Sequence, residues 1–234
     1  MKVNHMPRKA RILLPHTPHH IVQRGHNRQA VFVELADYQY YLDNLKEFKQ
    51  ALGVKVYSFC LMTNHVHLIV ECADDVSAIS HLLKRLAGRQ TRYVNRQEGR
   101  SGTLWEGRFK ASPIERDAYL LQCYRYVERN PVTAGMVQNP ADYPWSSYRH
   151  RIDEEHLSWL DDFAHLTNFG EDRASQIRRY RDFVEPENDR MHAFIQSAVQ
   201  KNQLTGTPRF IDEVEKRIGI RIEQRDQGRP VRGK

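Results

Sequence analysis

The sequence predicts an α+β fold with an antiparallel sheet, and two patterns carry this prediction. Short β-rich segments alternate with longer segments in which apolar residues recur every three or four positions, as in amphipathic helices. Two β-rich segments, 54–62 and 65–72, are separated only by Thr63 and Asn64, which favours an antiparallel hairpin. No stretch approaches the roughly 20 apolar residues that cross a bilayer, so we expect no membrane helix.

The elements follow in a simple order. A first strand is expected over 19–25, where Gly25 ends it, and a helix over 33–53 has its glycine stop at Gly53. After the hairpin, a helix begins near Asp75 or Ser77 and carries a basic side, for which a solvated surface is the plainer explanation. Pro113 favours an edge position for a last strand over 108–115. A final helix is expected from 117 to 130, ended by the proline at 131.

This order is the split βαβ, ferredoxin-like arrangement, with a four-stranded antiparallel sheet and one extra helix. Beyond about residue 150 the pattern changes to helical segments without strands, at 156–166, 174–184, 189–200 and 208–218. We therefore expect one domain over 1–150 and a helical extension with a basic tail over 151–234. The last two helices could form a helix-turn-helix that reads DNA, or they could serve only to pack against the rest of the fold.

The composition indicates a basic globular protein. The 234 residues carry 36 Lys and Arg and a net charge of +7, together with 11 tyrosines, which suits a phosphate backbone and unstacked bases; the alternative is a merely soluble basic surface. The three cysteines, Cys60, Cys72 and Cys123, lie in apolar segments without paired spacing. We expect buried free thiols, a reducing compartment and a cytoplasmic location.

Two histidines stand one residue apart at the head of the second hairpin strand. Side chains alternate across a strand, so His65 and His67 share one face. Two adjacent imidazoles can grip one metal ion, although strand histidines are more often solvated or hydrogen-bonded. A zinc hydrolase is one class of protein with such a pair.

The helix expected from 117 holds a second pair of polar groups. Tyr126 and Asn130 are four residues apart and share one face, whereas Tyr124 falls in the apolar stripe. The alternative is structural, with Asn130 as a C-terminal cap and Tyr126 as a half-buried aromatic residue.

Several motifs in the same order resemble the REP-associated tyrosine transposases, relatives of the IS200-like transposases among the single-tyrosine HUH nucleases, where U is a bulky apolar residue. These motifs are HHIVQRGHNRQAVF at 19–32, HVH at 65–67, LWEGRFKASPIE at 104–115 and YRYVERNPVTAGMV at 124–137. The resemblance covers roughly residues 10–150.

The resemblance implies a metal-dependent nuclease that joins itself to DNA. By this resemblance His65, His67 and Asn130 hold Mg²⁺ or Mn²⁺, and Tyr126 is the nucleophile that receives a 5′-phosphate, with Tyr124 as its competitor. Asn130 stands where IS200-like relatives more often have glutamine, which is one methylene longer. Cutting would be a transfer that conserves the phosphodiester bond energy.

The resemblance also implies the substrate, single-stranded DNA beside hairpins of repetitive extragenic palindromes (REP). Candidate DNA contacts come from the first loop and from the segment before the last strand: Arg24, His26, Asn27, Arg28, Trp105, Arg108, Phe109 and Lys110. Core packing is the alternative for Trp105 and Phe109. We expect a monomer, with a dimer as the alternative. The competing function is a regulator that keeps the fold and binds hairpin DNA or RNA without cutting.

Overall fold

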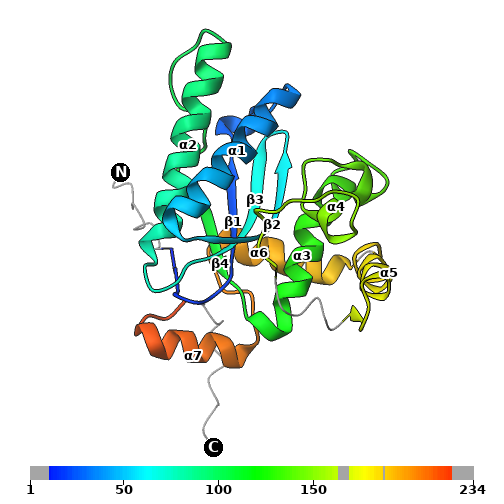
Figure 1. Ribbon diagram of the computed structural model, residues 1–234. Coiled ribbons are helices and arrows are strands. Elements are labelled where there is room, and N and C mark those ends of the chain that lie inside the picture. Colours follow the sequence, from blue (N-terminus) through cyan, green and yellow to red (C-terminus); the bar gives the residue numbers. More distant parts are fainter. Residues whose placement is uncertain (1–10, 163–168, 187, 223–234) are drawn as a thin grey trace, which may run out of the picture.

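The computed structural model describes residues 11–162, 169–186 and 188–222, and its centre is a four-stranded antiparallel sheet (Figure 1). The strands are β1 (His19–Arg24), β2 (Lys55–Met62), β3 (His65–Glu71) and β4 (Lys110–Pro113), in the spatial order β2-β3-β1-β4. This is the ferredoxin-like order, so the predicted fold class is confirmed. Pro113 lies on an edge strand, as expected.

Two helices cover one face of the sheet. They are α1 (Leu35–Leu52), which ends at Gly53 in a left-handed conformation with φ of 61°, and α2 (Ser77–Gln97). Phe59, Leu68 and Ile21 lie side by side across three strands and are fully buried against these helices. Because side chains alternate along a strand, one side of each of these three strands faces this main core.

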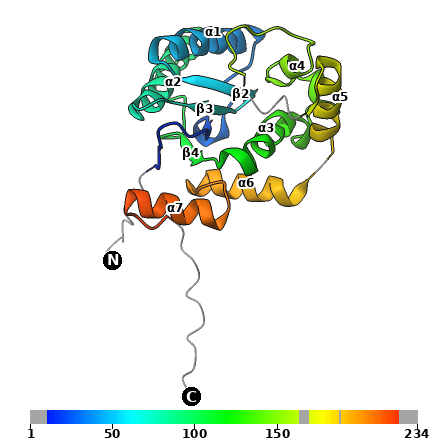
Figure 2. The ribbon, with the colours of Figure 1, turned by 60° about the horizontal axis from the view of Figure 1, so that its bottom comes forward.

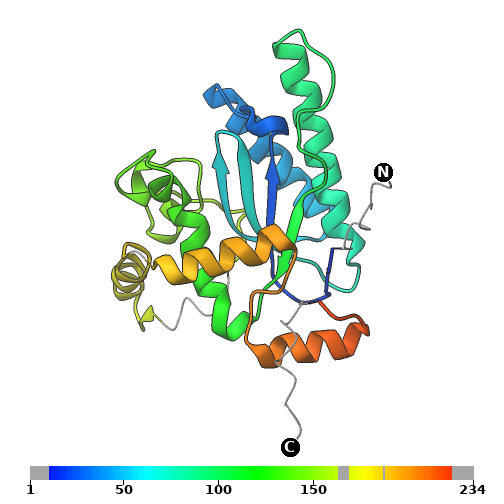
Figure 3. The same ribbon diagram turned by 180° about the vertical axis from the view of Figure 1, so that it is seen from behind.

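The opposite face of the sheet is covered by α3 (Arg116–Thr133) and α6 (Asp189–Lys201), so the sheet lies between two helical layers (Figure 2). A second core forms there, in which Ile69 of the sheet packs with Val127 of α3 and Ile195 of α6. Seen from behind, α6 runs across α3 and the end of β4 (Figure 3). The histidines of β3 point to this side.

The expected end of α3 at Asn130 is wrong, because the helix continues through Pro131 to Thr133. Proline removes one backbone donor, yet the last turn is closed by other bonds. The amide of Ala134 donates to the Asn130 carbonyl, and the amide of Met136 donates to the Pro131 carbonyl. Gly135 then ends the turn with φ of 68°.

The remaining described elements are short or belong to the extension. They are the 3₁₀ turns η1 (His26–Arg28) and η2 (Pro140–Asp142) and the helices α4 (Tyr148–Arg151), α5 (Arg173–Val184) and α7 (Pro208–Ile218). The three cysteines are buried and free, as expected. None of the helices that the structure describes is long and apolar enough to cross a lipid bilayer.

The helix expected over 156–166 is absent from its described part, 156–162. Instead, Asp161 pairs with the edge strand β2: its amide donates to the Val56 carbonyl, and its carboxylate accepts from the Val56 amide. These bonds tie Asp161 to the edge of the sheet, and the amide of Leu160 donates to the Leu157 carbonyl, so a turn stands where the helix was expected. The basic tail expected at the C-terminus lies largely outside the described residues.

The extension packs on the first 150 residues. Tyr180 of α5 donates a hydrogen bond to the buried carboxylate of Glu128 on α3, at 2.6 Å. Arg151 is also buried and donates to Asp162 and to the carbonyl of Tyr57. At the other end, Thr207 caps α7 and donates to Glu115. These contacts fix α5 and α7 relative to α3.

Candidate active site

His65 and His67 lie side by side on the sheet face that α3 and α6 cover. Their ring centroids are 4.9 Å apart, and the buried Val66 between them points to the main core. On the neighbouring strand β1, Arg24 stands opposite His65 and Val22 opposite His67. Lys110 of β4 stands opposite Val22 in turn. Cationic side chains therefore lie to one side of the two imidazoles, on the strands β1 and β4.

One nitrogen of each imidazole is already bonded. The Nδ1 atom of His65 lies 2.7 Å from Oδ1 of Asn64, which can only accept, so His65 carries its proton on Nδ1. The Nδ1 atom of His67 lies 2.9 Å from Nε2 of His20. The Nε2 nitrogen of each ring is left as the candidate metal-binding atom, an arrangement that is usual for metal-bound histidines.

The surroundings keep both rings neutral. Burial, with a contribution from the charge of Arg24, lowers the pKa of His65 to about 4. Burial and the neighbouring His65 lower the pKa of His67 well below its ordinary value. Neutral imidazole is the form that binds a metal, so both rings are ready to bind one at neutral pH.

Tyr126 projects from α3 toward these histidines. Its ring centroid lies 5.6 Å from that of His67 and 4.7 Å from that of His192 on α6. Burial raises the pKa of Tyr126 to about 12, and a hydrogen bond with Asn130 partly offsets this effect. The phenol is therefore protonated at neutral pH and needs a nearby cation to become a nucleophile. Tyr124 instead lies in the second core beneath the guanidinium of Arg151.

Asn130 lies one turn beyond Tyr126, and both residues border a cleft between the sheet, α3 and α6. Its Nδ2 atom donates to the Tyr126 carbonyl at 2.7 Å, which orients the amide along the helix. Among the described residues, no group of three or more His, Cys, Asp or Glu side chains is placed to hold a metal ion. The candidate donor set is thus two imidazoles and one amide. Such a set fits a divalent ion whose remaining positions are taken by phosphate oxygens and water.

The cleft between the sheet, α3 and α6 has a volume of about 980 Å³. It is bordered by the four candidate catalytic and metal-binding residues and by five of the candidate DNA contacts: His65, His67, Tyr126, Asn130, Arg24, His26, Arg108, Phe109 and Lys110. The sheet brings these residues together from four separate sequence segments. Asn27 and Arg28 do not border the cleft but are exposed in the adjoining turn η1.

The two aromatic candidates differ in their positions. Trp105 is only 4% exposed, and its indole N–H donates to the carbonyl of Ala87 on α2, so its ring belongs to the main core. Phe109 is also mostly buried but borders the cleft, and the guanidinium of Arg11 lies 3.9 Å from its ring centroid. The contacts of Trp105 match the packing alternative.

The sequence analysis missed several residues of the site. His20 is the hydrogen-bond partner of His67, and its position in the first strand, two residues before Val22, could have placed it on the same face. His192, Gln196 and Gln200 of α6 also border the cleft. Nothing in their sequence pattern connects a helix so distant in the chain with the histidines.

Comparisons with known proteins agree with the resemblance. Residues 15–130 match the family described as "Transposase IS200 like". A Haemophilus influenzae protein named "Putative REP-associated tyrosine transposase" is 25% identical over 132 residues, which are 50% of this chain and 75% of that protein. The fold is similar to a solved REP-associated tyrosine transposase bound to a REP hairpin, with a TM-score of 0.52 and 17% identity, over 68% of this chain and 96% of that one.

Proposed function

Because the chain belongs, over residues 15–130, to the IS200-like transposase family, we propose that it is a metal-dependent DNA strand transferase. Its substrate is single-stranded DNA beside a REP-type hairpin, which it nicks through a covalent 5′-phosphotyrosine intermediate. The proposal places the catalytic role on Tyr126 and the metal-binding role on His65, His67 and Asn130. The similarity to a protein solved with a REP hairpin supports the hairpin as partner.

One observation carries the proposal: a phenol, two neutral imidazoles and an amide border one cleft that also has cationic side chains. A binding protein would need the cations Arg24, Arg108 and Lys110, which suit phosphates. It would not need a tyrosine ring 5.6 Å from the ring of an uncharged histidine. A nucleophile beside a metal site does need this arrangement.

The proposed step exchanges one phosphodiester for another. The phenol oxygen of Tyr126 forms a bond to phosphorus while the bond from phosphorus to the 3′-oxygen breaks. The phenol gives up one proton, and the leaving 3′-oxygen takes up one proton and becomes a 3′-hydroxyl. A bound Mg²⁺ or Mn²⁺ would polarise the phosphate and offset the high pKa of the phenol. The 5′-phosphate stays on Tyr126 until a 3′-hydroxyl attacks it.

Arg24 and Lys110 hold the strand in this scheme. They stand on β1 and β4, on the same side of the histidines, where they can contact successive phosphates of the strand. His20 positions His67 through the hydrogen bond between their rings. We infer that one protomer acts on one hairpin, and light scattering of the mixed complex tests this stoichiometry.

The proposal is tested with a labelled hairpin oligonucleotide that carries a single-stranded flank, incubated with Mn²⁺ or Mg²⁺. We expect an adduct in which the 5′ end of the downstream fragment is joined to the peptide containing Tyr126, located by mass spectrometry. Tyr126→Phe should keep hairpin binding and lose both cutting and the adduct. Tyr124→Phe is the matched control and should still form the adduct. Chelation of the metal should stop cutting.

Three results would contradict parts of the proposal. Cutting by Tyr126→Phe without an adduct would indicate hydrolysis by water, as in a zinc hydrolase. An adduct on Tyr124 would move the nucleophile to the other helix face. Tight hairpin binding without any cutting by the wild type, with DNA or with RNA, would favour the regulator.

A further inference from the structure

Helix α6 forms one wall of the catalytic cleft, although it lies beyond the residues that match the family. His192, Gln196 and Gln200 border the cleft at intervals of four residues, so they form a stripe along one side of the helix. Gln196 and Gln200 are exposed, and neither carries a charge. The stripe is about 12 Å long at the rise of an α-helix, which is comparable to three or four nucleotides at about 3.4 Å each.

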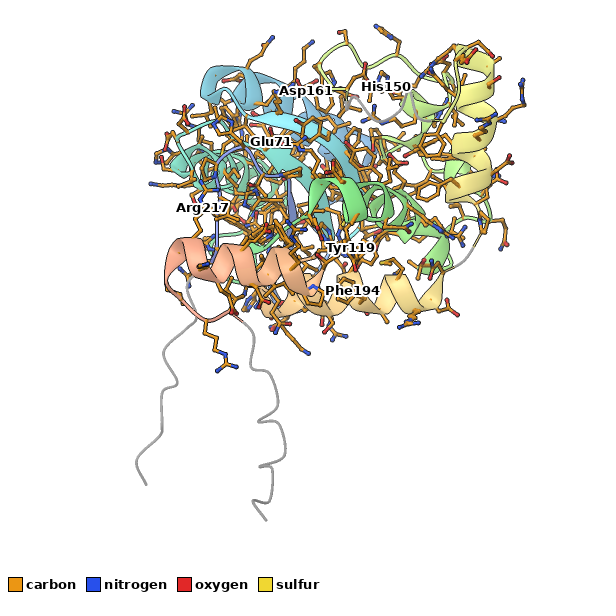
Figure 4. The ribbon with its side chains drawn as sticks, turned by 90° about the horizontal axis from the view of Figure 1, so that it is seen from below. Glu71, Tyr119, His150, Asp161, Phe194 and Arg217 are labelled. Atoms are coloured by element: carbon orange, nitrogen blue, oxygen red, sulfur yellow. The ribbon has the colours of Figure 1, made fainter. Side chains whose placement is uncertain are left out.

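The rest of α6 is fixed to the fold. Ile195 and Val199 are buried, and the ring of Phe194 lies 5.5 Å from that of Tyr119 on α3 (Figure 4). At the end of the helix, Oδ1 of Asn202 accepts a hydrogen bond from the amide of Ala111 on β4, at 3.1 Å. The polar stripe is therefore held at a set position over the sheet.

The two walls of the cleft differ in chemistry. The sheet side presents Arg24, Arg108 and Lys110, which are suited to phosphate oxygens. The α6 side presents an imidazole and two amides. An amide offers one donor and one acceptor side by side, which matches the edge of a base, with adenine as the best two-point partner. Phosphate contacts position a strand, whereas base contacts specify its sequence.

We propose that the stripe of His192, Gln196 and Gln200 reads the bases of the single strand that fills the cleft. The phosphates of that strand face the cationic wall and its bases face α6. His192 lies against Tyr126 and so borders the nucleotide at the scissile phosphate, while the two glutamines contact the nucleotides that follow. This inference rests on the proposed function and names the residues that set its sequence preference.

The test measures the affinity of hairpin oligonucleotides whose single-stranded flank is varied one base at a time, by fluorescence anisotropy at several salt concentrations. Gln196→Ala and Gln200→Ala should reduce the preference between the best and worst base at one flank position by roughly five-fold or more. The slope of affinity against salt should stay unchanged. Arg108→Gln should weaken binding to all sequences alike and reduce the slope of log affinity against log salt concentration by about one, the loss of one phosphate contact.

Gln97→Ala is the matched control, because Gln97 is an exposed glutamine on α2 that does not border the cleft. It should leave affinity and preference unchanged. Equal base preferences in the wild type and both glutamine variants would overturn the inference, as would a wild type with no preference in the flank. A wild type that binds no flanked hairpin would instead overturn the proposed function. Thermal unfolding checks that the variants fold.

Discussion

The Nε2 atom of His20 on β1 lies 2.9 Å from the Nδ1 atom of His67 on β3, and the two rings are stacked with centroids 5.1 Å apart. Both rings are buried. His67 can offer a lone pair on Nε2 only if its proton sits on Nδ1, and in that tautomer His20 accepts the hydrogen bond. In this tautomer, His20 would hold His67 in the form that the proposed metal site requires.

His20→Leu should therefore weaken metal binding while leaving the fold intact. We expect a loss of about 10- to 100-fold in Mn²⁺ affinity, the usual effect of removing an outer hydrogen-bond partner of a metal ligand. His20→Gln, whose amide oxygen can accept from Nδ1 of His67, should recover part of the affinity. Electron paramagnetic resonance titration of free Mn²⁺ measures both variants without reference to cutting. Wild-type affinity in His20→Leu would contradict the assigned role.

Trp105→Phe should lower stability and leave DNA affinity unchanged. The substitution removes the hydrogen bond from the indole N–H to Ala87 and leaves part of the core volume empty. We expect a loss of about 1–3 kcal/mol in the free energy of unfolding, measured with urea. Hairpin affinity per folded molecule should match the wild type. A selective loss of affinity with normal stability would mean that Trp105 stacks on a base after all.

His19 should make the fold sensitive to acid. Its ring is fully buried, its Nε2 atom accepts the amide of Leu14 at 3.0 Å, and burial lowers its pKa to about 4. In the unfolded chain the imidazole of His19 takes up a proton near pH 6.5, whereas in the folded chain it stays neutral down to about pH 4. Below pH 6.5 protonation therefore favours the unfolded chain, and the fold has its full stability from this group above that pH. This contribution, about 3 kcal/mol, is lost as pH falls from about 6.5 to about 4.

The measurement compares urea unfolding of the wild type and His19→Gln at several values of pH between 7 and 4.5. The glutamine oxygen can accept from Leu14 but takes up no proton, so the variant should lose less stability over this range. Other acid-sensitive groups affect both proteins and cancel in the comparison. His81→Gln, at an exposed position on α2, is the control and should follow the wild type. Parallel pH curves for wild type and His19→Gln would refute the assignment.

Tyr180→Phe should destabilise the contact between α5 and α3. The hydroxyl of Tyr180 and that of Ser147 each donate to a different oxygen of Glu128, which is fully buried. Without the hydroxyl of Tyr180, one carboxylate oxygen loses its donor, at a cost of about 1–3 kcal/mol in the free energy of unfolding. Tyr119→Phe is the control, because that hydroxyl has no part in the Glu128 network. Equal stability of the two variants would show that the network contributes nothing.

The sheet and its helices could be predicted from the sequence because their apolar residues recur with clear periods and turn or glycine residues mark where the elements end. The hairpin at Thr63 and the glycine stop at Gly53 are local signals, and both are confirmed. The predicted end of α3 at Pro131 is wrong because backbone hydrogen bonds beyond the proline close one more turn of the helix. No local sequence rule reveals these bonds. His192 depends on the packing of α6 across the sheet, which is a tertiary contact without a sequence pattern.

The division of α6 into a packed side and an exposed stripe has a consequence for how recognition can change. Gln196 and Gln200 are exposed at the cleft, whereas Ile195 and Val199 are buried and anchor the helix. Substitutions in the stripe that keep helical propensity therefore cost little stability and leave His65, His67 and Tyr126 in place. Under the proposed function, a library built at these two positions would explore new target sequences without changing the proposed catalytic residues, which makes α6 the natural starting point for altering the sequence preference.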